Sequence, residues 1–316
     1  FTFFPCCRPF LQPQTFDLQL LPFPPQRSHE HWLDDQQDIF PAGVVRAELA
    51  ALEAEAVTKT GQYDIFNQFP YVIPDAVGAG VLVPLDTYAE KGKPDFSSIE
   101  PGLRAQQYYD GKLYFFLLDG DHLILVLRKD LLELPGVKDA FKAKYGWEAG
   151  CPDTVEQWEQ LAEFFHTKRG DTKFGRTFDQ DVYGAMGYRA INFSYRHFPV
   201  YFGGLWFDKD MKPRVNTPEG IRALKQFTSI VKYMPPDIQG WGTPQIYPFF
   251  ASGQAFSVMT FPSLVGYAQS NPKSVVKDQM LSCVIPGFKK NGTLVRYSPQ
   301  AAGTGYMVSR YSKHPE

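Results

Sequence analysis

The chain has 316 residues, of which 44% are hydrophobic and 21% charged, a composition typical of a folded, soluble protein. A chain of this length usually forms more than one hydrophobic core, so two lobes are expected. With 32 basic and 34 acidic residues, the net charge is only -2. The chain has no excess of positive charge to attract nucleic acid, which is therefore not an expected partner.

Aromatic residues are more numerous than core packing alone requires, with 27 Phe, 17 Tyr and 5 Trp. An aromatic ring offers a flat apolar face to the C–H side of a pyranose, while neighbouring amides and carboxylates bond the sugar hydroxyls. Most of these rings are expected in the core, and the remainder favour a sugar-binding surface.

The N-terminal part alternates strand-like and helix-like segments. Short apolar runs predict strands at 16–21 (FDLQLL), 43–46 (GVVR) and 63–66 (YDIF). A polar segment at 28–40 predicts a first helix, and the strong helix formers of 47–59 predict a second, ended by Gly61. This alternation predicts an α/β fold with a mostly parallel sheet, which gathers ligands at the carboxyl ends of its strands.

Two helix starts are explicit farther along the chain. Thr154, with Gln157 three residues later, predicts a capped helix whose apolar stripe is core: Val155, Trp158, Leu161, Ala162 and Phe165. Thr217 before Pro218 predicts another start, with a buried face of Ile221, Leu224, Phe227 and Val231 and an end before Pro235. No repeat or low-complexity tract divides the chain, so several short crossings between the lobes are expected.

Four cysteines occur, at positions 6, 7, 151 and 283, without a C-x-x-C pair or a histidine at metal-ligand spacing. Neither a metal site nor a cofactor is expected. Cys151 and Cys283 leave two interpretations open, a disulfide formed in an oxidising compartment or two buried free thiols.

A series of stretches, read in order, resembles the sugar-binding group of extracellular solute-binding proteins, the maltose-binding-protein-like family that serves bacterial ABC importers. They are YDIF at 63–66, GVLVPLDTY at 80–88, YYDGKLYFF at 108–116, DGDHLILVLRKDL at 119–131, PDTVEQW at 152–158, YFGGLWFD at 201–208, NTPEGIRAL at 216–224, FFASGQAFSVM at 249–259 and SKHPE at 312–316. Each is a weak signature alone, and Val155 stands where the family usually has Trp. The resemblance rests on all of these stretches occurring in the same order as in the family.

The resemblance implies a two-lobed periplasmic-binding-protein fold of the α/β class, with ligand in the cleft between lobes and a hinge of several crossings. The first lobe is expected at 1–118 plus 297–316 and the second at 119–296. Residues 1–26 match the family poorly. Family members continue past the position of Glu316 with helices that complete the second lobe, so this chain is expected to lack them.

The implied function is capture of a small carbohydrate and its delivery to the membrane permease of an ABC importer, by a monomer that catalyses nothing. The implied location is the periplasm, or the cell surface as a lipoprotein. No run reaches the ~18 apolar residues that span a bilayer, and no signal segment opens the chain, so an exported protein would be present in its mature form.

Candidate ligand-binding residues of the first lobe follow strand-like segments. Gln68 and Tyr71 come after the run at 63–66, at its carboxyl end. The polar group Asp119, Asp121 and His122 interrupts an apolar stretch, and the resemblance places it at the first crossing between lobes. Asp119 or Asp121 is expected to accept hydrogen bonds from two sugar hydroxyls, although a solvated turn would show the same pattern.

The remaining candidates combine rings, amides and glycines on loops. Gly303 and Tyr306 lie in a returning segment that resembles a family strand where glycine lets the backbone approach the ligand. The second lobe is expected to contribute Tyr201, Trp206, Gln239, Trp241 and Phe261. Gly240 and Gly242 beside Trp241 make a structural role for its indole less expected than a ligand contact.

Two other functions remain open. A glycosidase would need two carboxylates facing each other across a bond, and residues two apart in one short loop rarely do so; no catalytic residue is assigned. The same fold could bind a peptide, a polyamine or a metal chelate, but those ligands favour a strongly acidic or His-rich site, which this near-neutral chain does not suggest.

Overall fold

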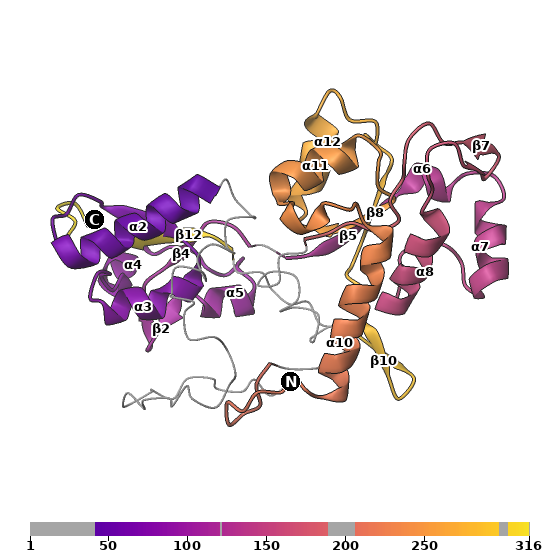
Figure 1. Ribbon diagram of the computed structural model, residues 1–316. Coiled ribbons are helices and arrows are strands. Elements are labelled where there is room, and N and C mark those ends of the chain that lie inside the picture. Colours follow the sequence, from indigo (N-terminus) through magenta and orange to yellow (C-terminus); the bar gives the residue numbers. More distant parts are fainter. Residues whose placement is uncertain (1–41, 121, 189–205, 297–302, 316) are drawn as a thin grey trace, which may run out of the picture. The chain divides into compact units, whose positions relative to one another are not determined.

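The computed structural model describes residues 42–120, 122–188, 206–296 and 303–315, with the backbone alone for 42–48. Contacts divide the chain into two compact units, which are described separately. Unit 1 holds the described residues 43–120 and 303–315, and unit 2 holds Ala42, 122–188 and 206–296. In Figure 1, yellow β12 lies among indigo and purple elements, so the end of the chain completes unit 1.

Unit 1 begins with helix α2, Ala42–Thr58. The predicted helix at 47–59 is confirmed, whereas the predicted strand at 43–46 is wrong, because those residues form the first turns of α2. After the helix, the buried carboxylate of Glu55 accepts hydrogen bonds from the backbone N–H of Gly61 and of Gln62. Gly61 adopts a positive φ, and a side chain there would collide with the carbonyl of Tyr311.

Three strands form the sheet of unit 1 in the order β1 (Ile65–Gln68), β12 (Gly305–Val308), β4 (Phe116–Leu117). Both pairings are antiparallel, and Phe66 lies opposite Met307. The mostly parallel sheet predicted from the alternation is therefore wrong for these strands, because the central partner comes from the far end of the chain. Phe66, Ile73, Phe115 and Met307 are buried in one core cluster with Leu52 of α2.

The other elements of unit 1 are short. The helices are η2 (Pro70–Val72), α3 (Ile73–Gly78), α4 (Asp86–Gly92) and α5 (Pro101–Ala105), and strands β2 (Tyr108–Tyr109) and β3 (Lys112–Leu113) form a hairpin. Asp110 and Gly111 between these strands both have positive φ, the geometry of a two-residue hairpin turn with the sequence Asp-Gly.

Unit 2 is built around β5, Ile124–Arg128, which pairs antiparallel with β8 (Ser257–Thr260) and with β9 (Met280–Cys283). A continuous apolar run is expected for a strand with neighbours on both edges, and Leu125, Val126 and Leu127 are fully buried.

Helix α8, Val155–Phe165, has the predicted capping box, in which Thr154 accepts from the Gln157 N–H and the Gln157 side chain accepts from the Thr154 N–H. All five residues of its predicted stripe are buried. The Trp158 indole N–H donates to the Ser257 hydroxyl at 2.9 Å, which joins α8 to β8.

Helix α10, Pro218–Ser229, begins as predicted, with Thr217 accepting from the Gly220 N–H. Its predicted buried face is wrong in part: Phe227 is buried, but Ile221 and Leu224 are 43% and 46% exposed. The face toward the core carries Gly220 and Ala223 instead. A side chain on Gly220 would lie 2.3 Å from the carbonyl oxygen of Val215, in the segment just before the helix.

Cys151 and Cys283 form a disulfide with Cα atoms 5.5 Å apart, which resolves the two interpretations left open by the sequence. The bond joins the segment before α8 to the last residue of β9. Nearby, the Val155 N–H donates to the Gly287 carbonyl at 3.1 Å, and the Gly287 N–H donates to the Asp153 carbonyl at 2.8 Å. The start of α8 is thus held by a covalent bond and by backbone hydrogen bonds.

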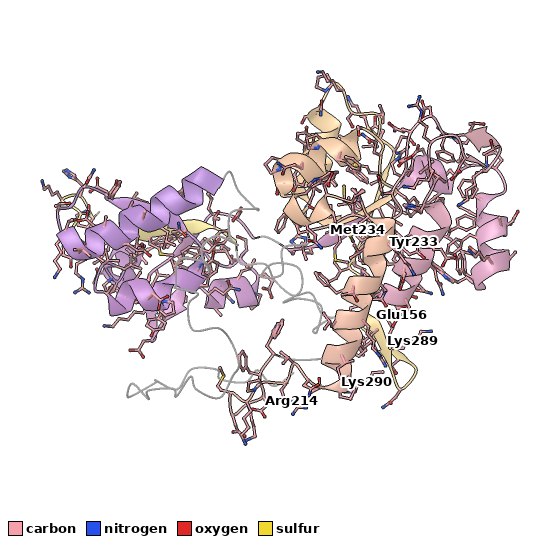
Figure 2. The ribbon with its side chains drawn as sticks, in the orientation of Figure 1. Glu156, Arg214, Tyr233, Met234, Lys289 and Lys290 are labelled. Carbon is pink, nitrogen blue, oxygen red and sulfur yellow. A yellow bond between two sulfur atoms is a disulfide. The ribbon has the colours of Figure 1, made fainter. Side chains whose placement is uncertain are left out.

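The other helices and strands of unit 2 lie outside the β8-β5-β9 sheet. They are α6 (Lys129–Leu132), α7 (Val137–Tyr145), β6 (Thr172–Lys173), β7 (Arg176–Thr177), η4 (Ile230–Tyr233), η5 (Ile238–Gly240), α11 (Thr243–Ala251), α12 (Ser263–Ser270), β10 (Phe288–Lys290) and β11 (Thr293–Val295). Met234 after η4 is buried, and the β10 lysines Lys289 and Lys290 are exposed (Figure 2). Among the described helices, none is long and apolar enough to cross a membrane.

Candidate functional site

Two predicted site residues of unit 1, Gln68 and Tyr306, lie on paired strands where β1 ends and β12 begins. Gln68 is the last residue of β1, is buried, and lies opposite Gly305 in the sheet. Tyr306 lies opposite Asn67 and Phe116, and its side chain is 41% exposed. The pairing therefore brings residues from both ends of the chain to one edge of the sheet.

Asp119 lies at the same edge, two residues after β4. Its Oδ1 atom accepts a hydrogen bond from the Thr304 N–H at 2.5 Å and another from the Thr304 hydroxyl at 3.0 Å. In return, the backbone N–H groups of Leu118 and Asp119 donate to the Thr304 carbonyl. Asp119 therefore fixes the start of β12, and its binding of sugar hydroxyls stays a prediction.

The glycines on either side of Thr304 are required by contacts within the chain. A Cβ atom on Gly303 would lie 1.7 Å from the Asp119 carbonyl oxygen. One on Gly305 would lie 2.3 Å from the Phe116 carbonyl oxygen and 2.5 Å from the ring of Phe115. These distances account for both glycines through the packing of β12 against the end of β4. An approach of the Gly303 backbone to ligand remains a prediction.

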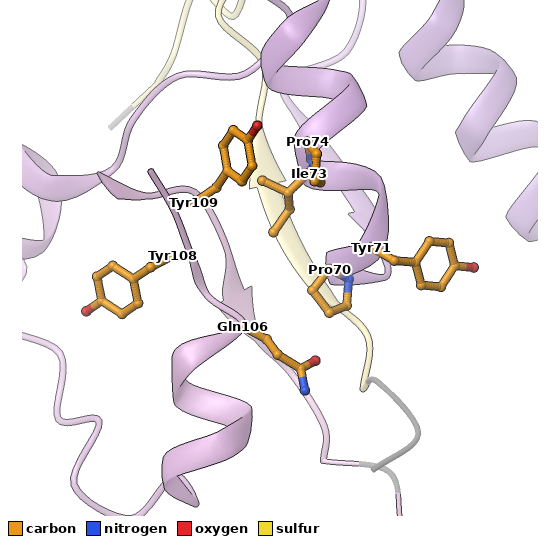
Figure 3. Close-up of a pocket in the computed structure, with 7 residues that line it drawn as sticks. All are labelled: Pro70, Tyr71, Ile73, Pro74, Gln106, Tyr108 and Tyr109. Carbon is orange, nitrogen blue, oxygen red and sulfur yellow. The ribbon is translucent and has the colours of Figure 1, made fainter. Parts of the chain in front are cut away.

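A pocket of about 310 Å³ is lined by residues of unit 1 alone. This volume is at the lower end of the ~300–1,000 Å³ of small-molecule sites. Figure 3 shows the ring of Tyr109 near Ile73 and Pro74, and the Gln106 amide on the side of Pro70. The lining is Pro70, Tyr71, Ile73, Pro74, Gln106, Tyr108 and Tyr109, none of which carries a charge.

Tyr71 is the one residue of this lining that the sequence singled out as a ligand contact. It is 46% exposed, and its ring stacks on that of Phe69 at 5.3 Å between centroids with an interplanar angle of 10°. Tyr108 and Tyr109 appeared in the sequence only as part of a family hairpin. Their exposure could not be read from it, because neighbouring strand residues point to opposite faces and one is normally buried.

Two aromatic candidates of unit 2, Trp241 and Phe261, pack in or against its core. Trp241 is partly buried, packs against the core cluster, and contacts the ring of Phe249 at 4.7 Å. Phe261 is only 5% exposed and contacts the ring of Tyr188 at 5.5 Å. The expectation that the glycines beside Trp241 argue against a structural role is wrong, since the neighbouring helix α11 supplies the packing. Gln239 is exposed on η5.

A cluster of hydroxyl groups beside Phe261 was missed in the sequence. The Tyr188 hydroxyl lies 2.7 Å from the Thr243 hydroxyl and accepts from Thr260 at 3.3 Å. The Tyr247 and Ser263 hydroxyls lie 2.7 Å apart. Burial raises the pKa of Tyr188 far above its ordinary value, so its hydroxyl stays protonated and able to donate. Three separate segments bring these groups together, which no local pattern reveals.

The other predicted residues are scattered or undescribed. His122 is exposed, just before β5. Trp206 is partly buried and its carbonyl accepts from the Arg214 N–H in a turn where Asp208 accepts from the N–H groups of Asp210 and Lys212. Asp121 and Tyr201 lie outside the described residues. Within the described part of the chain, no group of three or more His, Cys, Asp or Glu side chains is placed to hold a metal ion.

Comparison with known families gives one match over most of the chain. The model of the bacterial extracellular solute-binding protein family matches residues 40–316. Among proteins with curated functions, none matches this chain.

Solved structures share the fold at low sequence identity. An ABC transporter solute-binding protein from Agrobacterium vitis S4 with bound D-mannitol is 21% identical, with a TM-score of 0.64, over 84% of this chain and 60% of that one. An ABC substrate-binding protein from Listeria monocytogenes in complex with cycloalternan is 21% identical, with a TM-score of 0.63, over 84% and 62%. A maltose/maltodextrin-binding domain from Bdellovibrio bacteriovorus bound to maltotriose is 19% identical, with a TM-score of 0.61, over 85% and 62%.

These similarities establish the fold class as the two-lobed α/β architecture of periplasmic binding proteins. The chain spans less than two thirds of the length of each of these relatives.

Proposed function

The chain belongs to the bacterial extracellular solute-binding protein family, and from this premise we propose that it captures a small carbohydrate for the permease of an ABC importer. The family binds solutes, so the proposal assigns no reaction to the chain. Solved structures of the same fold carry mannitol, cycloalternan and maltotriose, which supports a polyhydroxylated ligand.

The observation that favours carbohydrate over other solutes is the uncharged, tyrosine-lined pocket of unit 1. Peptides, polyamines and metal chelates carry charges that need opposite charges or metal-binding groups in their site. The pocket offers rings with hydroxyl groups and the Gln106 amide instead. Rings can lie against the C–H face of a sugar, while hydroxyl and amide groups bond its hydroxyls.

The disulfide between Cys151 and Cys283 supports the extracellular location given by the family. Disulfides form and persist in oxidising compartments such as the periplasm or the cell exterior, and are rare in the cytosol. Within the proposal, the protein works as a monomer in the periplasm or as a lipoprotein at the cell surface, and a membrane permease receives the sugar from it.

A thermal-shift panel tests the proposal on the 316-residue chain. The panel contains D-mannitol, ribitol, tagatose, maltose and maltotriose, with putrescine, a tripeptide and a ferric chelate as controls. A ligand at 100 times its dissociation constant stabilises the folded state by ~2.7 kcal/mol, so a binder raises the melting temperature measurably. Stabilisation by a control solute and by none of the saccharides would contradict the proposal.

The rival function, a glycosidase, predicts turnover of an activated glycoside. We expect no release of nitrophenol from nitrophenyl glucosides, galactosides or xylosides beyond the uncatalysed rate. Turnover that co-purifies with the protein and disappears in Asp119→Asn would assign a reaction to the chain instead.

A further inference from the structure

Three tyrosine side chains of the pocket lining in unit 1 keep much of their surface in contact with solvent. Tyr71, Tyr108 and Tyr109 are 46%, 43% and 38% exposed. Single exposed rings are ordinary on a protein surface, but exposed rings that gather around one depression mark an interaction site. The grouping therefore marks a surface that a partner can cover.

Apart from the tyrosines and Gln106, the pocket lining is apolar. Pro70 and Ile73 are buried, and Pro74 on α3 completes the lining. In Figure 3 the hydroxyl ends of Tyr71 and Tyr108 point away from Pro70. The surface thus combines ring carbons with two prolines, and two of the tyrosine hydroxyl groups lie on its outer sides.

The β2–β3 hairpin, which carries two of the tyrosines, is held in place by the rest of unit 1. The Leu85 N–H donates to the Leu113 carbonyl at 2.7 Å, and the Leu113 N–H donates to the Asp86 carboxylate at 3.3 Å. Just before the hairpin, the buried Gln107 side chain accepts from the Leu117 N–H at 3.1 Å. A surface fixed in this way loses little conformational freedom when a partner binds.

Tyrosine rings, prolines and an amide on an uncharged surface are groups suited to a proline-rich peptide. Such peptides adopt the extended polyproline II conformation, which has no internal hydrogen bonds, and they dock in grooves lined with aromatic rings. Their proline rings pack against the aromatic rings, and their carbonyl groups accept hydrogen bonds from amide or hydroxyl donors such as those of Gln106 and Tyr108. Because proline fixes its own φ, such a peptide also loses little freedom on binding.

The chain itself contains a sequence of this kind. Residues 21–26 read LPFPPQ, with three prolines and no charged side chain. They lie outside the described residues. The family model matches the chain only from residue 40, so the family fold does not account for them. An uncharged, proline-rich segment and an uncharged, tyrosine-lined pocket are complementary in composition.

The stretch 27–41 is long enough to carry this segment to the pocket. Fully extended, it would span up to ~50 Å. It leads into α2, whose Leu52 is buried in the same core cluster as Ile73 of the pocket lining. A compact unit of ~90 residues has a radius of gyration of ~12 Å, so this tether is longer than the unit is wide. A tethered segment is presented to the pocket at a high effective concentration.

We propose that residues 21–26 bind in the pocket of unit 1 of the same chain as a proline-rich ligand. The prolines pack against the rings of Tyr71, Tyr108 and Tyr109, and the Gln106 amide donates to a backbone carbonyl of the segment. The inference goes beyond the proposed function and does not rest on it, since none of its readouts uses a sugar. A sugar that used the same rings would have to displace the segment, so the segment restricts access to the pocket.

Site-specific photo-cross-linking of the 316-residue chain tests the inference. p-Benzoylphenylalanine replaces Phe23, which lies among the three prolines, and mass spectrometry identifies the cross-linked peptides after irradiation and digestion. The same replacement at Phe3, which precedes the segment, is the matched control. A mixture of isotope-labelled and unlabelled chains separates links within one chain from links between two chains.

Cross-links from position 23 should be concentrated on residues 70–74 and 106–109 of the same chain. Replacing the three prolines of the segment together by alanine should lower the yield of these links about 2- to 10-fold, and so should Tyr71→Ala and Tyr109→Ala. Melting temperatures of the tyrosine variants should stay close to that of the unmodified chain, since exposed rings contribute little to folding.

Tyr63→Ala is the matched control on the side of the pocket and should leave the yield unchanged. Tyr63 has the same 38% exposure as Tyr109 and belongs to the same unit, but it does not line the pocket.

Three outcomes would overturn the inference. The first is that links from position 23 are no more concentrated on the pocket than those from position 3. The second is an unchanged yield in the proline variant and in both tyrosine variants. The third is that all links join two different chains, which would make the segment of a second copy the occupant. The map from position 23 needs no tyrosine variant, so it decides the matter even where such a variant fails to fold. A thermal-shift panel without any sugar binder would end the proposed function and leave this inference standing.

Discussion

Oδ1 of Asp119 accepts both the backbone N–H and the hydroxyl group of Thr304, which stands 185 positions later in the chain. The contact closes the sheet of unit 1 at the edge where several predicted ligand-binding residues gather. Removing the acceptor leaves the Thr304 N–H without this bond, and an unmade bond in a buried residue costs ~1–3 kcal/mol.

We therefore expect Asp119→Ala to destabilise the start of β12, whereas Asp119→Asn keeps an oxygen acceptor and loses less. Hydrogen exchange of the peptide that contains residues 303–308 measures the effect locally. Faster exchange in Asp119→Ala than in Asp119→Asn is the expected result, and equal protection in the two variants would speak against this role for Asp119.

The Cys151–Cys283 disulfide closes a segment with a sequence separation of 132. Loops of this length restrict the unfolded chain strongly, so removal of the bond should cost ~2–4 kcal/mol. The double variant Cys151→Ser, Cys283→Ser should unfold at lower urea concentration than the unmodified chain. Dithiothreitol should lower the urea midpoint of the unmodified chain to that of the double variant and should leave the variant unaffected. If dithiothreitol did not lower the urea midpoint of the unmodified chain, the disulfide between Cys151 and Cys283 would be contradicted.

Burial lowers the pKa of His166, and the nearby Lys168 adds to the effect. Its Nδ1 atom accepts from the Gly184 N–H at 3.3 Å, which a doubly protonated ring cannot do. A folded-state pKa below the unfolded value of ~6.5 means that the unfolded chain binds more protons, so this contribution to stability is complete above that value and is lost as the pH falls through the folded pKa.

The free energy of unfolding should therefore decrease as the pH falls below ~6.5, and His166→Gln should show a shallower decrease. Urea titrations at a series of pH values give both slopes. Parallel slopes for the two proteins would show that other groups cause the pH dependence.

Trp241 packs on the core of unit 2 and against Phe249, so its loss should affect folding. A fully buried Trp→Ala change costs ~3–5 kcal/mol, and a partly buried indole should cost less, ~1–3 kcal/mol. Trp241→Phe keeps a ring against Phe249 and should recover part of this. Urea unfolding of both variants tests whether Trp241→Phe is more stable than Trp241→Ala. An unchanged midpoint in Trp241→Ala would show that the indole contributes little to the core, and its contact with a ligand stays a prediction in either case.

Local sequence signals predicted the elements that depend on local chemistry. The capping box of Thr154 and Gln157 and the stripe behind it are properties of one helix, and both are confirmed. The strand predicted at 43–46 is wrong because a four-residue run with two valines fits the start of a helix as well as a strand. Once the strong helix formers after it nucleate α2, adding preceding residues costs little.

Signals that depend on distant partners were less informative. The direction of the sheet in unit 1 is set by β12, whose position between β1 and β4 follows from no pattern near residue 305. The buried face of α10 was predicted only in part, because Gly220 and Ala223 lie on it and are too small to give a strong apolar signal. The pocket tyrosines come from segments that are remote in sequence, at 71 and at 108–109, so only the fold brings them together.

The position of β12 at the centre of its sheet also sets an order of events during synthesis. The described residues of unit 2's core, within 122–188 and 206–296, all emerge before β12. Unit 1 cannot complete its sheet until β12 has left the ribosome or the export pore, because β1 and β4 pair only through that strand. Residues 65–68 and 116–117 are therefore made well before the strand through which they pair.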